Sequence, residues 1–169
     1  MSDTTATDFF PVLATIAFLA QLGVLAVSDA CTLKLPLGVN LSFCASGLLM
    51  SGEAFGTPVA DRYQGAILGY LALQIVAILY LWLRKQTGMG GGDPILLAGI
   101  GAWLGWQVLP ETVALASFLG LAMTLGLRIT GQFKGPWPTL RLPLGTLLLI
   151  SAIACVITGY AGGGFRIVS

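Results

Sequence analysis

The longest uncharged apolar segment that we assign to one helix, Tyr63 to Leu83, reads YQGAILGYLALQIVAILYLWL. A helix rises about 1.5 Å per residue, so a stretch of this length crosses a hydrocarbon core of about 30 Å. The apolar residues run continuously and do not alternate, which favours a membrane helix over a strand of a membrane barrel. The sequence therefore predicts a transmembrane helix here.

Further apolar segments lie on both sides of this stretch. We expect about six transmembrane helices, at about 9–27, 35–50, 63–83, 94–109, 111–127 and 142–161. The chain is 56% hydrophobic and only 9% charged, whereas soluble domains carry about 25% charged residues. Because residues 1–8 contain no Lys or Arg, the first segment lacks the basic start of a cleaved signal peptide. The prediction is one all-α, polytopic transmembrane domain over residues 1–169, with the lipid bilayer as its surroundings.

Composition also excludes several classes of function. The net charge is +1 and no basic run occurs, so nucleic-acid binding is not expected. The absence of histidine excludes His-based triads and HExxH zinc sites. Cys31, Cys44 and Cys155 stand far apart in apolar sequence, which predicts neither a disulfide framework nor a zinc site. Hydrolytic chemistry in this chain must therefore use carboxylates, a thiol or a hydroxyl.

Basic residues predict the orientation, because Lys and Arg collect in cytoplasmic loops. With six spans, Arg62 and Arg166 fall on one side of the membrane. The other side receives Lys34, Arg84, Lys85, Arg128, Lys134 and Arg141. Both termini are therefore expected on the periplasmic side, and the loops after the first, third and fifth spans in the cytoplasm. The acids on the periplasmic side are expected to be solvated; they are Asp3, Asp8, Glu53, Asp61 and Glu111.

Two acids remain at membrane depth, where an ionisable side chain costs roughly 2.5–3.5 kcal/mol to insert. Asp29 closes the first span in VSDA, and Asp93 opens the fourth in GMGGGDP, residues 88–94. Both fall on the predicted cytoplasmic side. Two neighbouring carboxylates do not both ionise easily, so one keeps a proton while the other deprotonates a water molecule. This pair is the candidate for aspartic protease chemistry.

Other interpretations of the two acids stay open at this point. Asp93 before Pro94 is also typical of a helix N-cap, and Asp29 is also typical of an interfacial residue paired with Lys34. In a small transporter, the two acids would form an ion relay. The glycines before Asp93 favour a site, because residues without side chains permit close approach of an extended substrate.

Three sequence blocks resemble the type IV prepilin peptidases. Gly90-Gly91-Gly92-Asp93, followed by GAWLGW at 101–106, is similar to the GxGD block of that family. Asp29, with Pro36 seven residues later and Gly47-Leu48-Leu49 beyond, resembles the block of the first catalytic aspartate. Leu142-Pro143-Leu144-Gly145 resembles the block that opens the last span. The blocks occur in the family's order and cover nearly the whole chain.

The resemblance implies an aspartic endopeptidase with Asp29 and Asp93 as catalytic residues and no metal or cofactor. Gly90, Gly91, Gly92 and Pro36 would form the active-site loop or contact the substrate. The implied substrates are prepilins or pseudopilins of a type IV pilus or type II secretion system. Their leader peptide would be cut at the cytoplasmic face of the bacterial inner membrane.

The chain also departs from the family pattern. Ile95 stands where the family usually has Lys, and Leu37 stands where it usually has Asp or Asn. These changes raise the alternative of a catalytically inactive relative that binds pilins. Longer members carry an N-terminal methyltransferase portion with paired CxxC motifs, which this sequence lacks. We therefore expect a short form that cuts without N-methylation.

Overall fold

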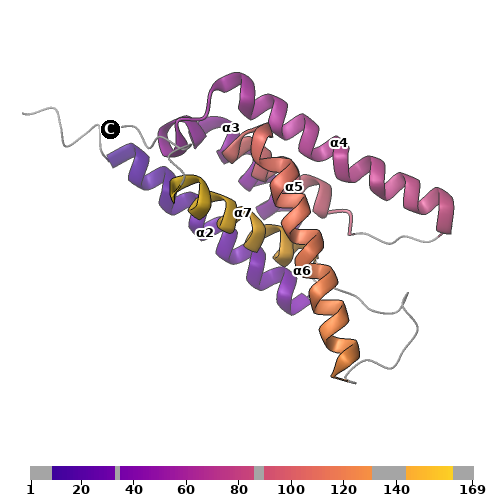
Figure 1. The fold of residues 1–169 in the computed structure, drawn as a ribbon. Coiled ribbons are helices and arrows are strands. Elements are labelled where there is room, and N and C mark those ends of the chain that lie inside the picture. The colour runs from indigo at the N-terminus through magenta and orange to yellow at the C-terminus, as the bar shows by residue number, and fades with distance from the viewer. Residues whose placement is uncertain (1–8, 33–34, 86–89, 131–143, 162–169) are drawn as a thin grey trace, which may run out of the picture.

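The computed structural model describes residues 9–32, 35–85, 90–130 and 144–161. The elements, in chain order, are α2 (Phe9–Thr32), α3 (Leu37–Phe55), α4 (Val59–Arg84), α5 (Asp93–Leu104), the 3-10 turn η1 (Trp106–Val108), α6 (Leu109–Ile129) and α7 (Leu144–Ala161). These six helices and one turn form an elongated bundle (Figure 1). No strand occurs in the described ranges, which confirms the all-α prediction.

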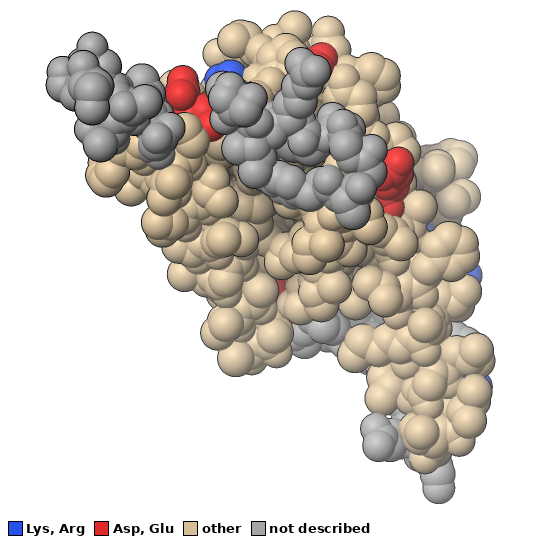
Figure 2. All heavy atoms as spheres, turned by 60° about the vertical axis from the view of Figure 1, so that its left-hand side comes forward, with Lys and Arg blue, Asp and Glu red and all other residues tan. Residues whose placement is uncertain are grey.

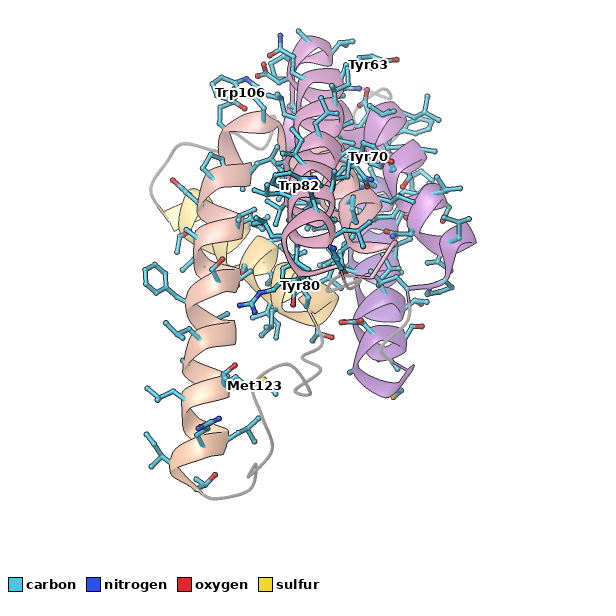
Figure 3. The ribbon with its side chains drawn as sticks, turned by 90° about the vertical axis from the view of Figure 1, so that its right-hand side faces the viewer. Tyr63, Tyr70, Tyr80, Trp82, Trp106 and Met123 are labelled. Atoms are coloured by element: carbon cyan, nitrogen blue, oxygen red, sulfur yellow. The ribbon has the colours of Figure 1, made fainter. Side chains whose placement is uncertain are left out.

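Within the described residues, three segments are long and apolar enough to cross a membrane, namely Phe9–Cys31, Val59–Arg84 and Trp106–Ile129. Only 11% of the apolar window in α4 is buried, so most of its apolar side chains face outward. Tyr63 and Trp82, labelled in Figure 3, lie near the two ends of α4 and are both exposed. At 1.5 Å per residue they are about 28 Å apart along the helix axis, which suits aromatic side chains at the two interfaces of a bilayer. Most atoms on the face drawn in Figure 2 belong to uncharged residues, as a lipid-facing surface requires.

The centre of the bundle is α5, which packs between α3 and α4 and also contacts α7. Every residue of α5 except Ile95 is buried. Its 12 residues reach about 18 Å, too short to cross the membrane alone. The predicted fourth span at 94–109 is therefore wrong in extent. The helix ends at Leu104 because Gly105 takes φ 87° and ψ 169°, and α6 begins at Leu109, slightly before its predicted start.

Glycines bring α4 and α5 into backbone contact. A Cβ atom on Gly65 would collide with the backbone carbonyl of Gly101, and a Cβ on Gly101 would collide with that of Gly65. One turn away, a Cβ on Gly69 would lie 2.5 Å from the carbonyl oxygen of Leu97. These three glycines thus let the backbones of α4 and α5 approach each other. Gly126 has no such role among the described residues, because a Cβ added there would meet no atom within 4 Å.

An aromatic cluster forms the middle of the core around Trp103, whose side chain is 0% exposed. Its ring centroid lies 5.1 Å from that of Phe18, 6.2 Å from Phe43 and 6.1 Å from Phe55. The indole Nε1 donates a hydrogen bond of 2.9 Å to the carbonyl of Phe43. Gly47 makes room for the indole, because a Cβ there would lie 2.8 Å from Trp103 Cδ1. Trp103 of the GAWLGW block is thus at the centre of the core, whereas Trp106 is exposed.

Consecutive helices run in opposite directions, so α2, α4 and α6 end where α3, α5 and α7 begin. Arg84, Lys85 and Arg128 lie at this end of the bundle, and Arg62 lies at the opposite end. Arg62 there donates hydrogen bonds to the carbonyls of Thr57 and Leu48, at 2.8 and 3.2 Å. The side-chain positions thus follow the predicted charge asymmetry for the described basic residues.

Candidate active site

Asp29 lies in the last turn of α2, inside the helix and not beyond its end, and is 5% exposed. Its Oδ2 accepts hydrogen bonds from the backbone N–H of Thr146 at 2.6 Å and from Thr146 Oγ1 at 3.0 Å. Thr146 belongs to the first turn of α7, where backbone N–H groups have no partner within the helix. Gly145 permits this contact, because a Cβ there would lie 3.0 Å from Asp29 Cγ. Two donors on one oxygen suit a negatively charged carboxylate.

The alternative partner of Asp29, Lys34, lies outside the described residues. The position of the Asp29 side chain nevertheless differs from that of an interfacial residue, whose carboxyl group would be directed toward water. The carboxyl group of Asp29 is buried between α2 and the start of α7, where Thr146 donates both hydrogen bonds to its Oδ2.

Asp93 is the first residue of α5 and is 6% exposed. The N-cap of α5 is Gly92, and no side chain makes a capping hydrogen bond there, so the interpretation of Asp93 as the N-cap is wrong. Instead, Asp93 Oδ2 accepts a hydrogen bond from the N–H of Gly90 at 3.2 Å, and the N–H of Asp93 donates to the carbonyl of Gly90 at 3.2 Å. These two bonds close a turn of four residues, which we call the Gly90–Asp93 turn. The turn carries the carboxyl group at its end.

The glycines of this turn have different surroundings. Gly92 packs against Leu35, since a Cβ would lie 2.8 Å from Leu35 Cβ. Gly91 is exposed, and a Cβ there would meet no atom within 4 Å. Gly92 is therefore required by the packing of the protein itself, whereas Gly91 leaves open space beside Asp93. Pro36 is exposed, and its carbonyl accepts the N–H of Asn40 at 3.0 Å at the start of α3.

The fold brings the two aspartates to the same end of the bundle. Leu35 lies between them. It contacts Gly92, which precedes Asp93, and its Cδ1 would lie 3.2 Å from a Cβ added to Gly145, the glycine that packs against Asp29. Asp93 precedes the apolar part of α5 and lies outside the three spanning segments. The pKa of Asp93 is raised to about 6, first by burial of its carboxyl group and second by the negative charge of Asp29, while the hydrogen bond from Gly90 lowers it. Asp29 is thus close enough to Asp93 for its charge to affect the pKa of Asp93.

Among the described residues, Asp29 and Asp93 are the only buried acids. The same part of the chain holds no group of three or more His, Cys, Asp or Glu side chains that could bind a metal ion. Two coupled carboxylates can share one proton and act as general base and general acid on the same bond. The other acids that are described do not join them: Glu53 and Glu111 are exposed, and Asp61 accepts a hydrogen bond from Gln107 at 3.0 Å.

Three residues near the aspartates were not predicted from the sequence, namely Leu35, Asn40 and Thr146. Thr146 directly follows the Leu-Pro-Leu-Gly block, so its position after a recognised block was an available signal. Asn40 was visible as an amide inside an otherwise apolar segment, where polar side chains are expensive. Leu35 carries no signal, because an apolar residue beside a span is ordinary.

An apolar groove on the surface of the bundle has a volume of about 460 Å³. It lies between α3, α4 and α5 and is lined by Leu41, Cys44, Ala66, Ile67, Tyr70, Leu71, Ile95 and Ala98. Ile95, two residues after Asp93, is thus part of an apolar wall.

Comparisons with known proteins identify the family. The model of the type IV leader peptidase family matches residues 16–125. Relatives named prepilin leader peptidase/N-methyltransferase include one from Klebsiella pneumoniae, 43% identical over 107 residues, and one from Pectobacterium carotovorum subsp. carotovorum, 39% identical over 129 residues. These alignments cover 63% and 72% of this chain, and 47% and 46% of the relatives.

A relative of the same name from Aeromonas salmonicida is 32% identical over 155 residues, which is 92% of this chain and 52% of the relative. The chain thus spans about half the length of the curated relatives that it matches. No solved structure gives a significant match. The family model covers well over half of the sequence and includes both aspartates, and the chain therefore belongs to the type IV leader peptidase family.

Proposed function

We propose that the chain is an aspartic endopeptidase that uses Asp29 and Asp93 to cleave the leader peptide of type IV prepilins or pseudopilins. The observation that carries the proposal is the pair of buried carboxyl groups at one end of the bundle, where the negative charge of Asp29 contributes to the raised pKa of Asp93. Family membership supports the reaction class. The relatives, named prepilin leader peptidase/N-methyltransferase, support the class of substrate.

In the proposed mechanism the two aspartates have different roles. Asp29 is the general base, because two hydrogen bonds from Thr146 hold its carboxylate as an acceptor. Asp93 keeps the shared proton, because burial and the charge of Asp29 disfavour a second negative charge.

The bond changes follow from these roles. Asp29 removes a proton from water, and the resulting hydroxide attacks the scissile carbonyl carbon. Asp93 protonates the carbonyl oxygen, which gives a neutral tetrahedral diol. Its collapse breaks the C–N bond when Asp29 returns the proton to the leaving amine and Asp93 recovers its own proton from the diol. The open space at Gly91 is the proposed place for the extended backbone of the substrate.

For the membrane arrangement we propose a single domain over residues 1–169 with six transmembrane helices, both termini periplasmic, in the bacterial inner membrane. The active site would face the cytoplasm. Arg84, Lys85 and Arg128 at the same end as the aspartates support this orientation, with Arg62 at the other end. The fourth of these six helices, α5, is short and would lie inside the bundle, surrounded by protein and not by lipid.

A second candidate function is a relative that binds pilins without cutting them. One observation favours it: Ile95, two residues after Asp93, lines an apolar groove at a position where a cation is usual in the family. Retention of both carboxyl groups in one buried site favours the enzyme.

The test is cleavage of a co-expressed prepilin-type substrate, detected as a leader-sized mobility shift. We expect the wild type to cut, and Asp29→Asn and Asp93→Asn each to lose about 10²–10⁴-fold in rate. Asp61→Asn is the matched control, because this acid bonds Gln107 at the opposite end of the bundle and should leave cleavage unchanged. If folded wild-type protein leaves several diverse prepilins uncut, the binding-only function replaces this proposal, and Ile95→Lys is the variant that would then restore cutting.

A further inference from the structure

Asn40, in the first turn of α3, makes an unusual contact with the Gly90–Asp93 turn. Its side chain is 0% exposed, and Nδ2 donates a hydrogen bond of 2.7 Å to the carbonyl of Gly92, the residue before Asp93. The two residues are 52 positions apart in sequence. This bond therefore ties α3 directly to the residue that precedes a proposed catalytic residue.

The carbonyl of Gly92 does not need this bond to be satisfied. It already accepts the N–H of Leu96 at 2.9 Å, as the first backbone hydrogen bond of α5. The bond from Asn40 is an additional one, and its effect is to fix where the turn lies relative to α3.

The side chain of Asn40 also has a feature that lowers the stability of the folded protein. Its Oδ1 is buried and has no hydrogen-bond partner within the described part of the chain. A buried polar atom without a partner costs about 1–3 kcal/mol. An apolar side chain of similar size would avoid this cost, so stability alone does not account for an amide here.

The two internal hydrogen bonds of the Gly90–Asp93 turn join Gly90 to Asp93 and do not attach the turn to a neighbouring helix. Among the described residues, Gly92 also makes an apolar contact with Leu35. Asn40 supplies the directional contact, and a hydrogen bond restricts orientation more closely than apolar packing does.

We propose that Asn40 is a positioning residue, which holds the Gly90–Asp93 turn against α3 so that the Asp93 carboxyl group stays directed toward Asp29. This inference deepens the proposed peptidase function and rests on it for its effect on catalysis. Asn40 contacts the backbone of Gly92 and takes no part in bond breaking. Small displacements of a reacting group are costly, since about 1 Å of misplacement can lower a rate by about 10²-fold.

The test compares Asn40→Leu with Ser51→Ala in detergent-solubilised protein. Ser51 is a matched control, because it is a fully buried polar residue of α3 whose Oγ also lacks a partner among the described residues, at the other end of the helix. We expect Asn40→Leu to lower kcat for prepilin cleavage about tenfold or more with KM nearly unchanged, and to leave the unfolding midpoint equal or higher. Ser51→Ala should keep the wild-type kcat.

Asn40→Asp adds a further measurement, the pH dependence of the cleavage deficit, which a purely structural role of Asn40 would not change. A carboxylate cannot donate to the carbonyl of Gly92, whereas a protonated carboxyl group can. We therefore expect the deficit of Asn40→Asp relative to wild type to shrink as the pH is lowered. A deficit that is constant with pH, or a wild-type kcat and KM in Asn40→Leu, would overturn the inference.

A second measurement separates this inference from the proposed function. Hydrogen–deuterium exchange of the backbone amides from Gly90 to Leu96 should speed up at least about tenfold in Asn40→Leu and stay unchanged in Ser51→Ala. Unchanged exchange in Asn40→Leu overturns the positioning role whether or not the protein cuts. Faster exchange in a protein whose wild type cuts no prepilin supports the anchoring contact and contradicts only the peptidase function.

Discussion

The contact of α4 with α5 and the contact of α2 with α7 both depend on glycine, but the glycines make room for different groups. Between α4 and α5, Gly65 and Gly101 allow two backbones to touch. Between α2 and α7, Gly145 makes room for the carboxyl group of Asp29, which then reaches the N–H of Thr146. The first contact sets the helix packing, and the second places a reacting group.

Because the two contacts involve different groups, substitutions at one should affect stability and substitutions at the other should affect catalysis. A backbone cannot move aside without displacing a helix, whereas a carboxyl group can turn by a few tenths of an ångström. Substitutions at the α4–α5 contact should therefore reduce the amount of folded protein. Substitutions at the α2–α7 contact should leave a folded protein that works poorly.

The largest effect is expected for Gly101→Leu, which would drive a side chain into the backbone of Gly65. Overpacking of a core commonly costs about 1–3 kcal/mol, and an obstacle made of backbone should cost more. We expect little folded protein after detergent extraction and a lowered thermal unfolding midpoint. Gly23→Leu is the control, because Gly23 is exposed and has nothing within 4 Å of its Cβ position. Equal midpoints for the two variants would contradict the close backbone contact.

The next effect is a pH dependence of cleavage. The pKa of Asp93 is raised to about 6, so the proton that the dyad needs is present below this pH and is lost as the pH rises through it. We expect kcat/KM, measured from pH 5 to pH 8, to fall about tenfold per unit on the alkaline side. Glu111→Gln should leave the profile unchanged, because this acid is exposed and lies on another helix. A flat profile would show that Asp93 does not act as the acid.

A smaller change is expected for Gly145→Ala at the α2–α7 contact. The added methyl group would lie 3.0 Å from Asp29 Cγ and 3.2 Å from Leu35 Cδ1, so the carboxyl group must shift by a few tenths of an ångström. We expect kcat to fall about tenfold with little change in the unfolding midpoint. Gly23→Ala, on the same helix as Asp29, should keep the wild-type kcat. A lowered unfolding midpoint with a normal kcat would show that the α2–α7 contact serves stability and does not place the carboxyl group of Asp29.

Much of the fold and the choice of the two aspartates were accessible from the sequence. Long apolar runs predict helices because the backbone must form its own hydrogen bonds in lipid. Asp29 and Asp93 were identifiable because carboxyl groups at membrane depth are rare and costly. Their burial at one end of the bundle agrees with that prediction. Their catalytic role stays a prediction, which the two Asn variants test.

The end of α5 and the partners of the two aspartates could not be predicted, because they depend on contacts between residues that are distant in sequence or on the conformation of one glycine. The apolar run from Pro94 continues past Gly105, and only the positive φ of that glycine ends α5 at Leu104. The partner of Asp29 lies 117 residues away, so only the packing of α7 on α2 brings Thr146 to it. An N-cap was a reasonable expectation for Asp93, but its carboxyl group bonds back to Gly90.

The smallest effect compares the two ends of α5. At the start of α5, Asn40 donates a hydrogen bond to the carbonyl of Gly92, just before the first turn of the helix. At the end of α5, Thr57 Oγ1 donates a hydrogen bond of 3.0 Å to the carbonyl of Trp103 in the last turn. The last four carbonyls of a helix have no partner within it, so the bond from Thr57 satisfies a group that would otherwise be buried and unpaired. Asn40, by contrast, bonds a carbonyl that Leu96 already satisfies.

Thr57→Val keeps the side-chain volume and removes only this bond. We expect it to lower the free energy of unfolding by about 1 kcal/mol and to leave kcat unchanged, the opposite of Asn40→Leu. The measurements are the unfolding midpoint and the cleavage rate in the same preparation. Thr124→Val is the control, because its hydroxyl bonds the carbonyl of Gly120 within its own helix at 2.7 Å. If Thr57→Val lowers kcat as much as Asn40→Leu does, both ends of α5 position the site, and the division between a stabilising end and a catalytic end is wrong.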